Sequence, residues 1–375
     1  MKVLHINRNY ITTALHQTMI EHLDATGIKS IVFAPTEKKT EAVIVPNSNV
    51  IVSECFRKRD RFIFSLKQLK ISKALASSCN VKEFDVIHAY TLFTDGNLAM
   101  KMKKKHNIPY IVSIRNTDVN DFFKKLVHLR RRGVKIMRQA AFICFLSEAY
   151  RKQVFDKYVP KRYRAELFSK SIIIPNGIDR FWHSNILPSP SYEKFERIKQ
   201  KEVNLVYAGR IDKNKNTQAI LKAMKLLEEE GWVTRLTVVG KIASKKEYKK
   251  VISSARATYI SQQQKEKLID IYRNNDMFVM PSFTESFGLV YAEAMSQGLP
   301  VVYTRGQGFD GQFPEGEVGY SAEANSVLSV AQAIKDIAEN YDEIAEKIAE
   351  KSLKFSWKPI AEKYLELYSA SAQGE

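Results

Sequence analysis

Residues 280–302 read MPSFTESFGLVYAEAMSQGLPVV, and their pattern predicts a strand end, a loop, a helix and a second strand. The apolar run Met277–Met280 is typical of a buried parallel strand, and Pro281 ends it because proline cannot continue a strand ladder. Leu289–Gln297 has helical spacing, and Gly298 is the expected stop before the next apolar run. This order is typical of an α/β fold.

Two glutamates give this stretch a chemical interpretation. Glu285 falls in the loop and Glu293 within the helix; if the helix begins near Ser286, Glu293 lies about 10 Å along its axis at a rise of ~1.5 Å per residue. That length suits a nucleoside diphosphate, and the free backbone amides at the helix start would face its phosphates. These are the amides of Ser286, Phe287, Gly288 and Leu289. The alternative is that Glu285 caps the helix and Glu293 is a solvated helix residue.

The whole string resembles the donor-site motif of the retaining glycosyltransferases of family 4, which have the GT-B fold. The matching elements are Pro-Ser, Glu285, Phe-Gly, a seven-residue gap to Glu293 and a Gly-x-Pro-Val-Val ending. The resemblance implies two doubly wound Rossmann-like domains facing a central cleft, with a C-terminal helix crossing back to the first domain. It also implies that Glu293 holds the nucleotide ribose, that Glu285 faces the donor sugar, and that the loop amides bind the diphosphate.

Length and composition favour a two-domain globular protein. With 375 residues and 45% hydrophobic content, the chain is long enough for two domains with separate cores. The three cysteines show no paired spacing, which favours reduced thiols. The first residues enter a strand pattern directly, and no apolar run approaches the ~18 residues of a membrane span. We therefore expect a cytoplasmic protein.

The net charge of +18 lies entirely in the first half of the chain. Residues 1–180 hold 33 Lys and Arg against 15 Asp and Glu, whereas the remainder holds 26 of each. Two segments, 57–75 and 121–139, mix basic and large apolar residues at near-helical spacing. Each either buries its apolar face in the domain core or lies on an anionic membrane surface, at roughly 1 kcal/mol per Lys or Arg. Nucleic acid is not an expected partner, because no zinc spacing, recognition helix or RNA-binding motif occurs.

Strand-like runs alternate with helical patterns in residues 1–180, which predicts a doubly wound sheet. The runs are Val3–Ile6, Ser30–Phe33, Asp85–Ala89, Pro109–Ile114 and Ala141–Leu146. Polar residues at or after the strand ends are expected to line one side of a cleft, where such sheets bind ligands. They are Arg8, Asn9, Tyr10, His88, Arg115, Asn116 and Asp118. For any one of them, an ordinary polar turn is an equal alternative.

The resemblance is weaker in this first half. Arg115 stands where many family members carry an active-site histidine, although the RNTD sequence that it opens resembles an Arg-Gly-Ser-Asp segment of some relatives. The usual glycine-rich turn after the first strand is replaced by NRNYITT. We therefore expect Arg115 and Asp118 in the cleft, and no catalytic histidine there.

The second domain begins after a Pro-Asn-Gly-Ile-Asp motif at residues 175–179, which resembles the family's interdomain crossing. The expected domains are 1–180 and 181–355, with helix 356–375 returning to the first. Within the second, a predicted strand ends at Gly209, which gives room there, and Arg210 and Lys215 project from the following loop. These cations can neutralise a departing diphosphate and so act as catalytic residues. The alternative is a pair of solvated loop cations.

Together these features predict a retaining glycosyltransferase that moves a sugar from a nucleotide-diphosphate sugar, UDP-sugar first, to a hydroxyl of a saccharide or lipid-linked acceptor. A role in bacterial cell-surface polysaccharide or glycolipid assembly is expected, with an anionic membrane surface as a further partner. No Asp-x-Asp motif occurs, so neither a metal ion nor another cofactor is expected. Two alternatives stay open: a non-catalytic scaffold of the same fold, and a nucleotide-sugar epimerase.

Overall fold

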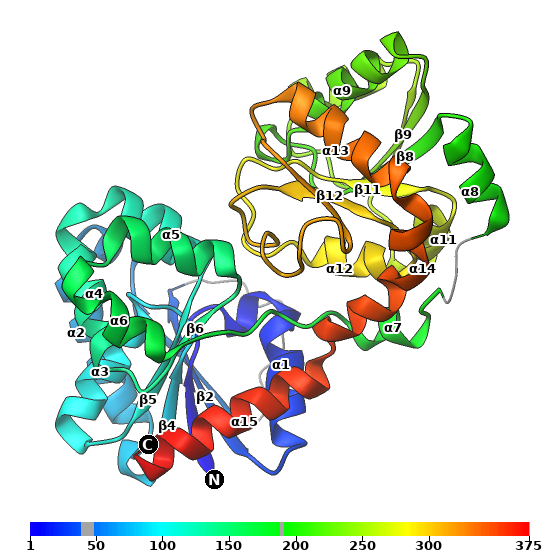
Figure 1. The fold of residues 1–375 in the computed structure, drawn as a ribbon. Helices are drawn as coiled ribbons and strands as arrows, with labels where there is room; N and C mark the ends of the chain where they lie inside the picture. Colours follow the sequence, from blue (N-terminus) through cyan, green and yellow to red (C-terminus); the bar gives the residue numbers. More distant parts are fainter. Residues whose placement is uncertain (39–48, 188–190, 375) are drawn as a thin grey trace. The chain divides into compact units, whose positions relative to one another are not determined.

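The computed structural model describes residues 1–38, 49–187 and 191–374, which form two compact units (Figure 1). The first unit contains residues 1–146, 150–177 and the C-terminal segment from Trp357; the second contains residues 147–149 and 178–356. The chain thus leaves the first unit inside the Pro-Asn-Gly-Ile-Asp motif. Residues 39–48 and 188–190 of the two predicted domain ranges lie outside the described part of the chain.

The first unit is built on a seven-stranded parallel sheet in the order β3-β2-β1-β4-β5-β6-β7. The five predicted strands are confirmed, and the Ile172–Ile174 run, also predicted as a strand, corresponds to β7. The sequence missed β3 because this edge strand is only half-buried and contains Ser and Glu. The bounds are β1 Lys2–Ile6, β2 Lys29–Glu37, β3 Val50–Phe56, β4 Val86–Ala89, β5 Tyr110–Ile114, β6 Ile143–Phe145 and β7 Ser171–Ile173.

Helices cover both faces of this sheet, as a doubly wound fold requires. Leu4 and Ile6 of β1 face a core shared with α2 to α6, whereas Val3 faces a second core shared with α1 and α15. The side chains alternate because successive strand residues point to opposite faces. The bounds are α1 Ala14–Asp24, α2 Phe64–Ser78, α3 Asp95–His106, α4 Arg130–Gln139, α5 Glu148–Tyr158, α6 Lys161–Ser169 and α15 Trp357–Gln373.

The C-terminal helix α15 belongs to the first unit, as predicted. It lies beside α1 and packs on β4 and β5, seen in red along the sheet in Figure 1. Its aromatic side chains Trp357, Tyr364 and Tyr368 are buried in the core that it shares with α1. Gly177 is required at this contact, since a Cβ there would come within 2.4 Å of the Trp357 ring.

The second unit is a six-stranded parallel sheet in the order β10-β9-β8-β11-β12-β13. Strands β8, β9, β11 and β12 were predicted; β10 and β13 were not, because neither contains a continuous apolar run. The strand bounds are β8 Glu202–Ala208, β9 Val233–Val239, β10 Ala257–Ile260, β11 Met277–Val279, β12 Val301–Thr304 and β13 Gly319–Ala322. The helix bounds are α7 Arg180–Ser184, α8 Tyr192–Lys199, α9 Thr217–Glu229, α10 Lys245–Ile252, α11 Lys265–Arg273, α12 Leu289–Ser296, α13 Val327–Glu339 and α14 Tyr341–Lys351.

The two basic segments of the first unit bury part of their apolar surface and expose the rest. Helix α2 buries Ile71 and Leu75, and α4 buries Val134, Ile136 and Met137. Large apolar side chains stay exposed at Ile63, Leu66 and Leu69 in the first segment and at Leu126 and Val127 in the second. The side chains of residues 61 and 62 lie outside the description. No helix in the described ranges is long and apolar enough to cross a bilayer.

Candidate functional site

Two loops of the second unit, residues 209–216 after β8 and 281–288 after β11, form one structure at the carboxyl edge of the sheet; we call them the donor-site loops. The Phe283 amide donates to the Asn214 carbonyl at 2.8 Å, and the Asn214 side chain donates to the Thr284 carbonyl at 2.9 Å. Asn216 donates to the Pro281 carbonyl at 3.1 Å. These bonds hold residues that are far apart in sequence in fixed positions.

Asn216 has a backbone conformation that few side chains tolerate. Its φ of 56° is left-handed, a region that asparagine tolerates better than other side chains apart from glycine. Its side-chain amide also donates to the Ala324 carbonyl at 2.8 Å. Asparagine therefore meets the backbone requirement and joins this loop to the residues after β13.

The predicted catalytic residues Lys215 and Glu285 form an ion pair, with Nζ and Oε2 2.5 Å apart. Their side chains are only 17% and 10% exposed, so the pair is weakly screened by water. Arg210 is placed differently: its guanidinium is 66% exposed and contacts the Asp212 carboxylate at 3.0 Å. Of these two cations, Lys215 is largely buried and already holds a carboxylate, whereas Arg210 is exposed and can turn toward an anion.

Gly209 lies where the second unit needs room at the end of β8. A Cβ on the neighbouring Gly240 would come within 1.9 Å of the Gly209 carbonyl oxygen, so these two backbone segments are in direct contact. The Tyr207 hydroxyl donates to the Arg210 carbonyl at 2.6 Å. The first turn of the loop is thereby fixed before the arginine side chain leaves it.

Helix α12 begins at Leu289 and not near Ser286, which corrects the predicted geometry. Gly288 has a φ of 79°, so it precedes the helix as a left-handed cap. From Leu289 to Glu293 the helix rises only about 6 Å at ~1.5 Å per residue, less than the 10 Å expected. A side chain at Gly288 is excluded as well, since its Cβ would lie 2.5 Å from the Tyr291 ring.

The amides at the start of α12 are open, with one exception. The Ser286 amide donates to its neighbour's carboxylate, Glu285 Oε1, at 3.0 Å, contrary to the expectation that it is free. Across the described residues, no acceptor is found for the amides of Phe287, Gly288, Leu289 and Val290. The Phe287 side chain is buried against Phe309 and Phe355, so this residue can offer a ligand only its backbone. Such amides at the positive end of a helix bind anions.

Glu293 is half-buried, which argues against the alternative of a solvated helix residue. Burial raises its pKa to about 7, with the Asp179 carboxylate adding to the shift and Lys265 opposing it. Asp179 and Lys265 pair with each other at 2.7 Å. Over the described ranges, the Glu293 carboxylate has no hydrogen-bond partner. It is therefore available to hydroxyl donors.

Tyr272 of α11 is a neighbour of Glu293 that the sequence did not reveal. Its hydroxyl is buried and finds no partner among the described residues. Burial raises the pKa of Tyr272 well above its usual range, and the Glu293 charge adds to the shift. Buried hydroxyls normally have a partner, so this one is a candidate ligand contact. In the sequence Tyr272 looked like an ordinary apolar position of an amphipathic helix.

At the edge of the first unit, several predicted cleft residues belong to the core instead. His88 is fully buried, with Nδ1 2.7 Å from the Tyr368 hydroxyl and Nε2 3.0 Å from Ser113 Oγ. Burial holds its pKa well below the usual range, so the ring is neutral. Tyr10 is likewise buried in an apolar cluster with Ile11 and Ile20. The prediction that His88 and Tyr10 line a cleft is wrong, because both side chains point into packed structure.

Asp118 is also a structural residue. Its buried carboxylate accepts the amides of Leu92 at 3.0 Å, Phe93 at 3.2 Å and Arg115 at 2.9 Å. Burial raises its pKa to about 6, although the three amides lower it. The carboxylate thus holds two edge loops together, and no oxygen of it points to an open surface: the prediction for Asp118 as a cleft residue is wrong.

The other predicted residues of this edge remain accessible. Arg115 is half-buried and donates from Nη1 to Asn176 Oδ1 at 2.9 Å, which ties it to the Pro-Asn-Gly-Ile-Asp motif. Asn116 accepts a bond from Asn120 at 2.6 Å, and Asn9 is exposed. Arg8 lies over the Phe56 ring at 5.5 Å.

Three buried polar atoms at this edge lack a partner among the described residues, and the sequence indicated none of them. They are Asn7 Nδ2, His16 Nδ1 and Asp95 Oδ1. Burial lowers the pKa of His16 to about 3, with Arg115 adding, and raises that of Asp95 to about 7. Unsatisfied atoms of this kind make these residues stronger candidates for acceptor contacts than His88 or Asp118.

Comparison with known proteins relates each of the two units to glycosyltransferases. The model described as Glycosyltransferase Family 4 matches residues 17–180, and the model described as Glycosyl transferases group 1 matches residues 189–355. One glycosyltransferase model thus matches each unit, and the fold is GT-B. This fold is shared by sucrose-phosphate synthase from Thermosynechococcus elongatus (TM-score 0.72, 18% identity, all of both chains). It is also shared by the lipopolysaccharide galactosyltransferase WaaB (TM-score 0.74, 12% identity, 99% of both chains).

The curated relatives of the chain include one protein named for a glucosyl diacylglycerol and one named for inositol phosphate. Alpha-monoglucosyldiacylglycerol synthase of Acholeplasma laidlawii is 26% identical over 66% of this chain and 65% of its own length. A D-inositol 3-phosphate glycosyltransferase of Pseudarthrobacter chlorophenolicus is 31% identical over 45% of this chain and 43% of its own. In both cases the match spans less than two thirds of the relative.

Proposed function

We propose that this glycosyltransferase moves a sugar from a nucleotide-diphosphate sugar, UDP-sugar first, to an acceptor hydroxyl with retention of configuration. The observation that carries the proposal is the Lys215–Glu285 pair next to the open amides of α12. Glu285 is adjacent to those amides, because its Cγ would lie 3.2 Å from a Cβ on Gly288. A cation, a carboxylate and anion-binding amides therefore share one small region of the second unit.

Each group has a role in the proposed transfer. The amides of Phe287, Gly288 and Leu289 bind the diphosphate, and Lys215 with Arg210 stabilises the charge that grows on it as the bond from the sugar C1 to the phosphate oxygen breaks. The acceptor oxygen bonds to C1 on the same face, and its proton passes to the phosphate oxygen. Glu285 faces the sugar. The proposal assigns charge neutralisation to protein groups and needs no metal ion; over the described ranges no cluster of three or more His, Cys, Asp or Glu is arranged to hold one.

A nucleoside is proposed to bind along α12. Glu293 offers a carboxylate without a protein partner, and the Tyr272 hydroxyl beside it is also unpaired within the described chain. Ribose hydroxyls would supply the donors that these oxygens lack. A UDP donor is supported by the fold relative HepE of Anabaena, whose solved complex contains UDP-glucose.

The acceptor is proposed to be a saccharide or a lipid-linked molecule of bacterial surface assembly. Support comes from a relative named for a glucosyl diacylglycerol and from exposed apolar side chains next to basic ones in the first unit. Ile63, Leu66 and Leu69 lie along the start of α2, and Leu126 and Val127 follow Lys124 and Lys125. The ring contact of Phe64 with Phe122 at 6.4 Å brings the two segments together. Such a surface suits peripheral binding to an anionic bilayer.

The test is a thermal-shift panel of UDP, GDP, ADP and CMP, each with and without its sugar. A nucleotide at 100 times its Kd adds about 2.7 kcal/mol of stability, which raises Tm clearly. We expect one nucleotide to shift the wild type and the control Glu346→Ala, an exposed helical glutamate of the same unit, but not Glu293→Ala. If no nucleotide shifts the wild type, the donor site does not work as proposed and the non-catalytic scaffold becomes the better account.

Further outcomes separate the remaining alternatives. Slow hydrolysis of a nucleotide sugar in the absence of acceptor excludes a scaffold, whereas release of an epimerised sugar identifies an epimerase. Undiminished activity on a soluble acceptor without any lipid contradicts a lipid-linked acceptor.

A further inference from the structure

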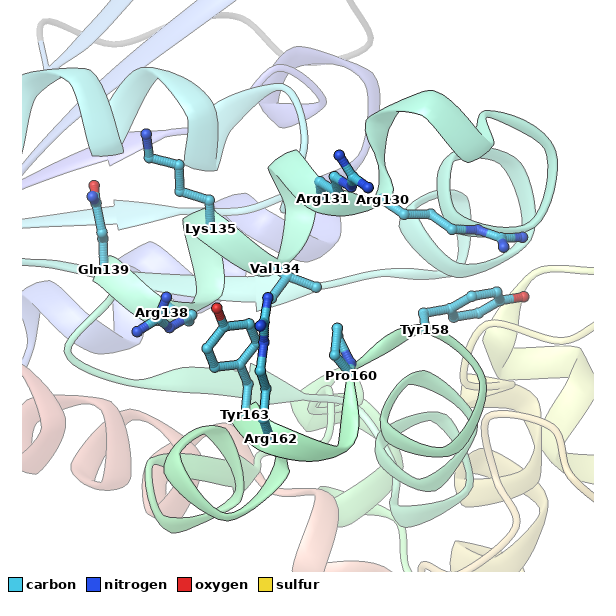
Figure 2. A pocket seen from close by; sticks show the side chains of 10 residues that line it. All are labelled: Arg130, Arg131, Val134, Lys135, Arg138, Gln139, Tyr158, Pro160, Arg162 and Tyr163. Carbon is cyan, nitrogen blue, oxygen red and sulfur yellow. The ribbon is translucent and has the colours of Figure 1, made fainter.

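The first unit contains a cavity of about 740 Å³ between α4 and the chain that runs from the end of α5 into α6. We call it the α4–α6 pocket; Figure 2 shows its lining from close by. Its volume is in the range of small-molecule sites. None of its residues belongs to the donor-site loops or to the edge of the first sheet.

The lining is strongly basic. Five cations contribute to it and no acidic residue does: Arg130, Arg131, Lys135, Arg138 and Arg162. Outside the lining, Glu166 pairs with Arg138, with Nε and Oε2 3.1 Å apart. Within the described chain, the side chains of Arg131 and Lys135 form no hydrogen bond or ion pair. The protein therefore neutralises only part of the positive charge that lines the pocket.

Two tyrosines hold three of these guanidinium groups in place. The Tyr163 ring contacts two of them, with Arg138 Cζ at 4.1 Å and Arg162 Cζ at 4.7 Å from its centre. Arg130 Cζ lies 4.9 Å from the Tyr158 ring, and its Nε donates to the Phe123 carbonyl at 2.7 Å. In Figure 2 the Tyr163 ring stands next to the Arg138 and Arg162 side chains. Because the arginines are already oriented, they lose less conformational entropy when they bind.

The chemistry of the pocket fits a phosphate group better than a lipid tail. Guanidinium groups match phosphate oxygens with two parallel hydrogen bonds. The exposed large apolar side chains of the unit lie elsewhere, at Met1, Val52, residues 63–69 and 126–127 and Phe168, and none of them lines the cavity. Val134, which also lines it, is buried in the core. The site is thus a basic recess beside a packed helix.

We propose that the α4–α6 pocket binds a phosphate-bearing anion through Arg130, Arg138 and Arg162. The ligand is either soluble, as a diphosphate, or the headgroup of a lipid that carries a phosphate monoester. The site is separate from the donor-site loops, and the proposal does not depend on the proposed transfer.

The test measures binding of two probes at low ionic strength: inorganic pyrophosphate by calorimetry, and vesicles with and without phosphatidic acid by co-sedimentation. Arg162→Gln removes one pocket cation whose side chain has no hydrogen bond to any described residue. Lys73→Gln is the matched control, since Lys73 lines a second basic cavity of about 480 Å³ near α2. Arg162→Gln should weaken at least one probe about tenfold, and Lys73→Gln should weaken it less than twofold.

The pattern of outcomes identifies the source of the phosphate. A loss for pyrophosphate indicates a soluble ligand, and a loss for vesicles alone indicates a lipid headgroup. Equal weakening by both variants would show diffuse surface charge and overturn the proposal, as would the absence of binding of either probe. Pyrophosphate binding that Lys215→Met abolishes and Arg162→Gln does not would place the probe in the donor-site loops, which also overturns it. Tyr163→Leu keeps every charge and should weaken the affected probe as well, because it frees both arginines.

Discussion

The carboxyl edges of the two parallel sheets use polar residues in different ways. In the second unit, Lys215 and Glu285 meet across 70 residues of sequence beside amides that lack acceptors. In the first unit, His88 and Asp118 sit at the equivalent edge but are fully engaged by Tyr368, Ser113 and backbone amides. Parallel topology supplies an edge in both cases, but packing decides whether a polar side chain there is left for a ligand.

Replacing Lys215, the largely buried cation of the donor-site loops, should have the largest effect on catalysis. Lys215→Ala deletes a charge that stabilises the leaving diphosphate, and it removes the cation that pairs with the largely buried Glu285 carboxylate. Loss of one preoriented group of this kind costs about 2.7–4 kcal/mol, a fall of roughly 10²–10³ in kcat. Steady-state kinetics with the nucleotide sugar found in the thermal-shift panel measures it. Lys213→Ala, an exposed lysine of the same loop, is the control and should stay near wild type; a Lys215→Ala enzyme within threefold of wild type would contradict the assignment.

At the edge of the first unit the expected effect is on stability and not on catalysis. Tyr368→Phe removes the hydroxyl 2.7 Å from His88 Nδ1 and leaves a buried nitrogen unpaired, which costs about 1–3 kcal/mol. Denaturant unfolding should show this loss, while kcat below the unfolding range stays unchanged. Tyr320→Phe removes a part-exposed hydroxyl that contacts Asn340 and should cost far less. A large fall in kcat for Tyr368→Phe without a loss of stability would contradict this prediction and indicate that His88 acts in the active site.

The pH dependence of nucleotide binding tests whether the charged Glu293 carboxylate accepts hydrogen bonds from the ribose. Its pKa is about 7 in the free protein, and hydroxyl donors from a ribose favour the charged carboxylate, so the bound pKa must be lower. Binding then releases a proton, and affinity rises with pH until the free carboxyl is ionised. We expect a gain of about tenfold between pH 6 and pH 8, measured by calorimetry. Glu293→Gln cannot ionise and should give a flat profile over this window; an equal slope in that variant would point to another group.

Removal of divalent metal ions by a chelator should have the smallest effect on turnover. If Lys215, Arg210 and the amides of α12 neutralise the diphosphate, treatment with EDTA followed by gel filtration leaves turnover within twofold of the untreated enzyme. If EDTA abolished activity and Mg²⁺ or Mn²⁺ restored it, catalysis at the donor-site loops would depend on a metal ion and not on protein cations alone.

Much of the site formed by the donor-site loops and the start of α12 was predictable, because most of its residues lie in one continuous stretch of sequence. One stretch, residues 280–302, contains the strand end, the glycine cap, the open amides and both glutamates, so local sequence rules reach most of the site. The helical spacing predicted from Leu289 is confirmed, but the 10 Å length assumed a start near Ser286, because the sequence pattern does not show whether Gly288 lies inside the helix or caps it. The Ser286 amide was misjudged for a related reason: its acceptor is a side chain whose rotamer the sequence does not show.

The edge of the first unit was less predictable because its residues depend on distant partners. His88 is neutral and structural owing to Tyr368, 280 residues away on a helix that returns to the first sheet. The unpaired atoms of Asn7, His16 and Asp95 are visible only after packing removes every other acceptor or donor from reach. In the sequence, Arg130 and Arg138 likewise look like parts of one basic helix; only the tertiary structure shows that Tyr158 and Tyr163 pack against them.

The sequence by itself determined the two parallel α/β units, the concentration of positive charge in residues 1–180 and the position of the donor-site motif, because strand and helix periodicity and contiguous motifs are local properties. The tertiary structure decided which polar groups are available to ligands. Burial, pairing and pKa depend on atoms brought together from remote parts of the chain, such as Lys215 with Glu285 and His88 with Tyr368.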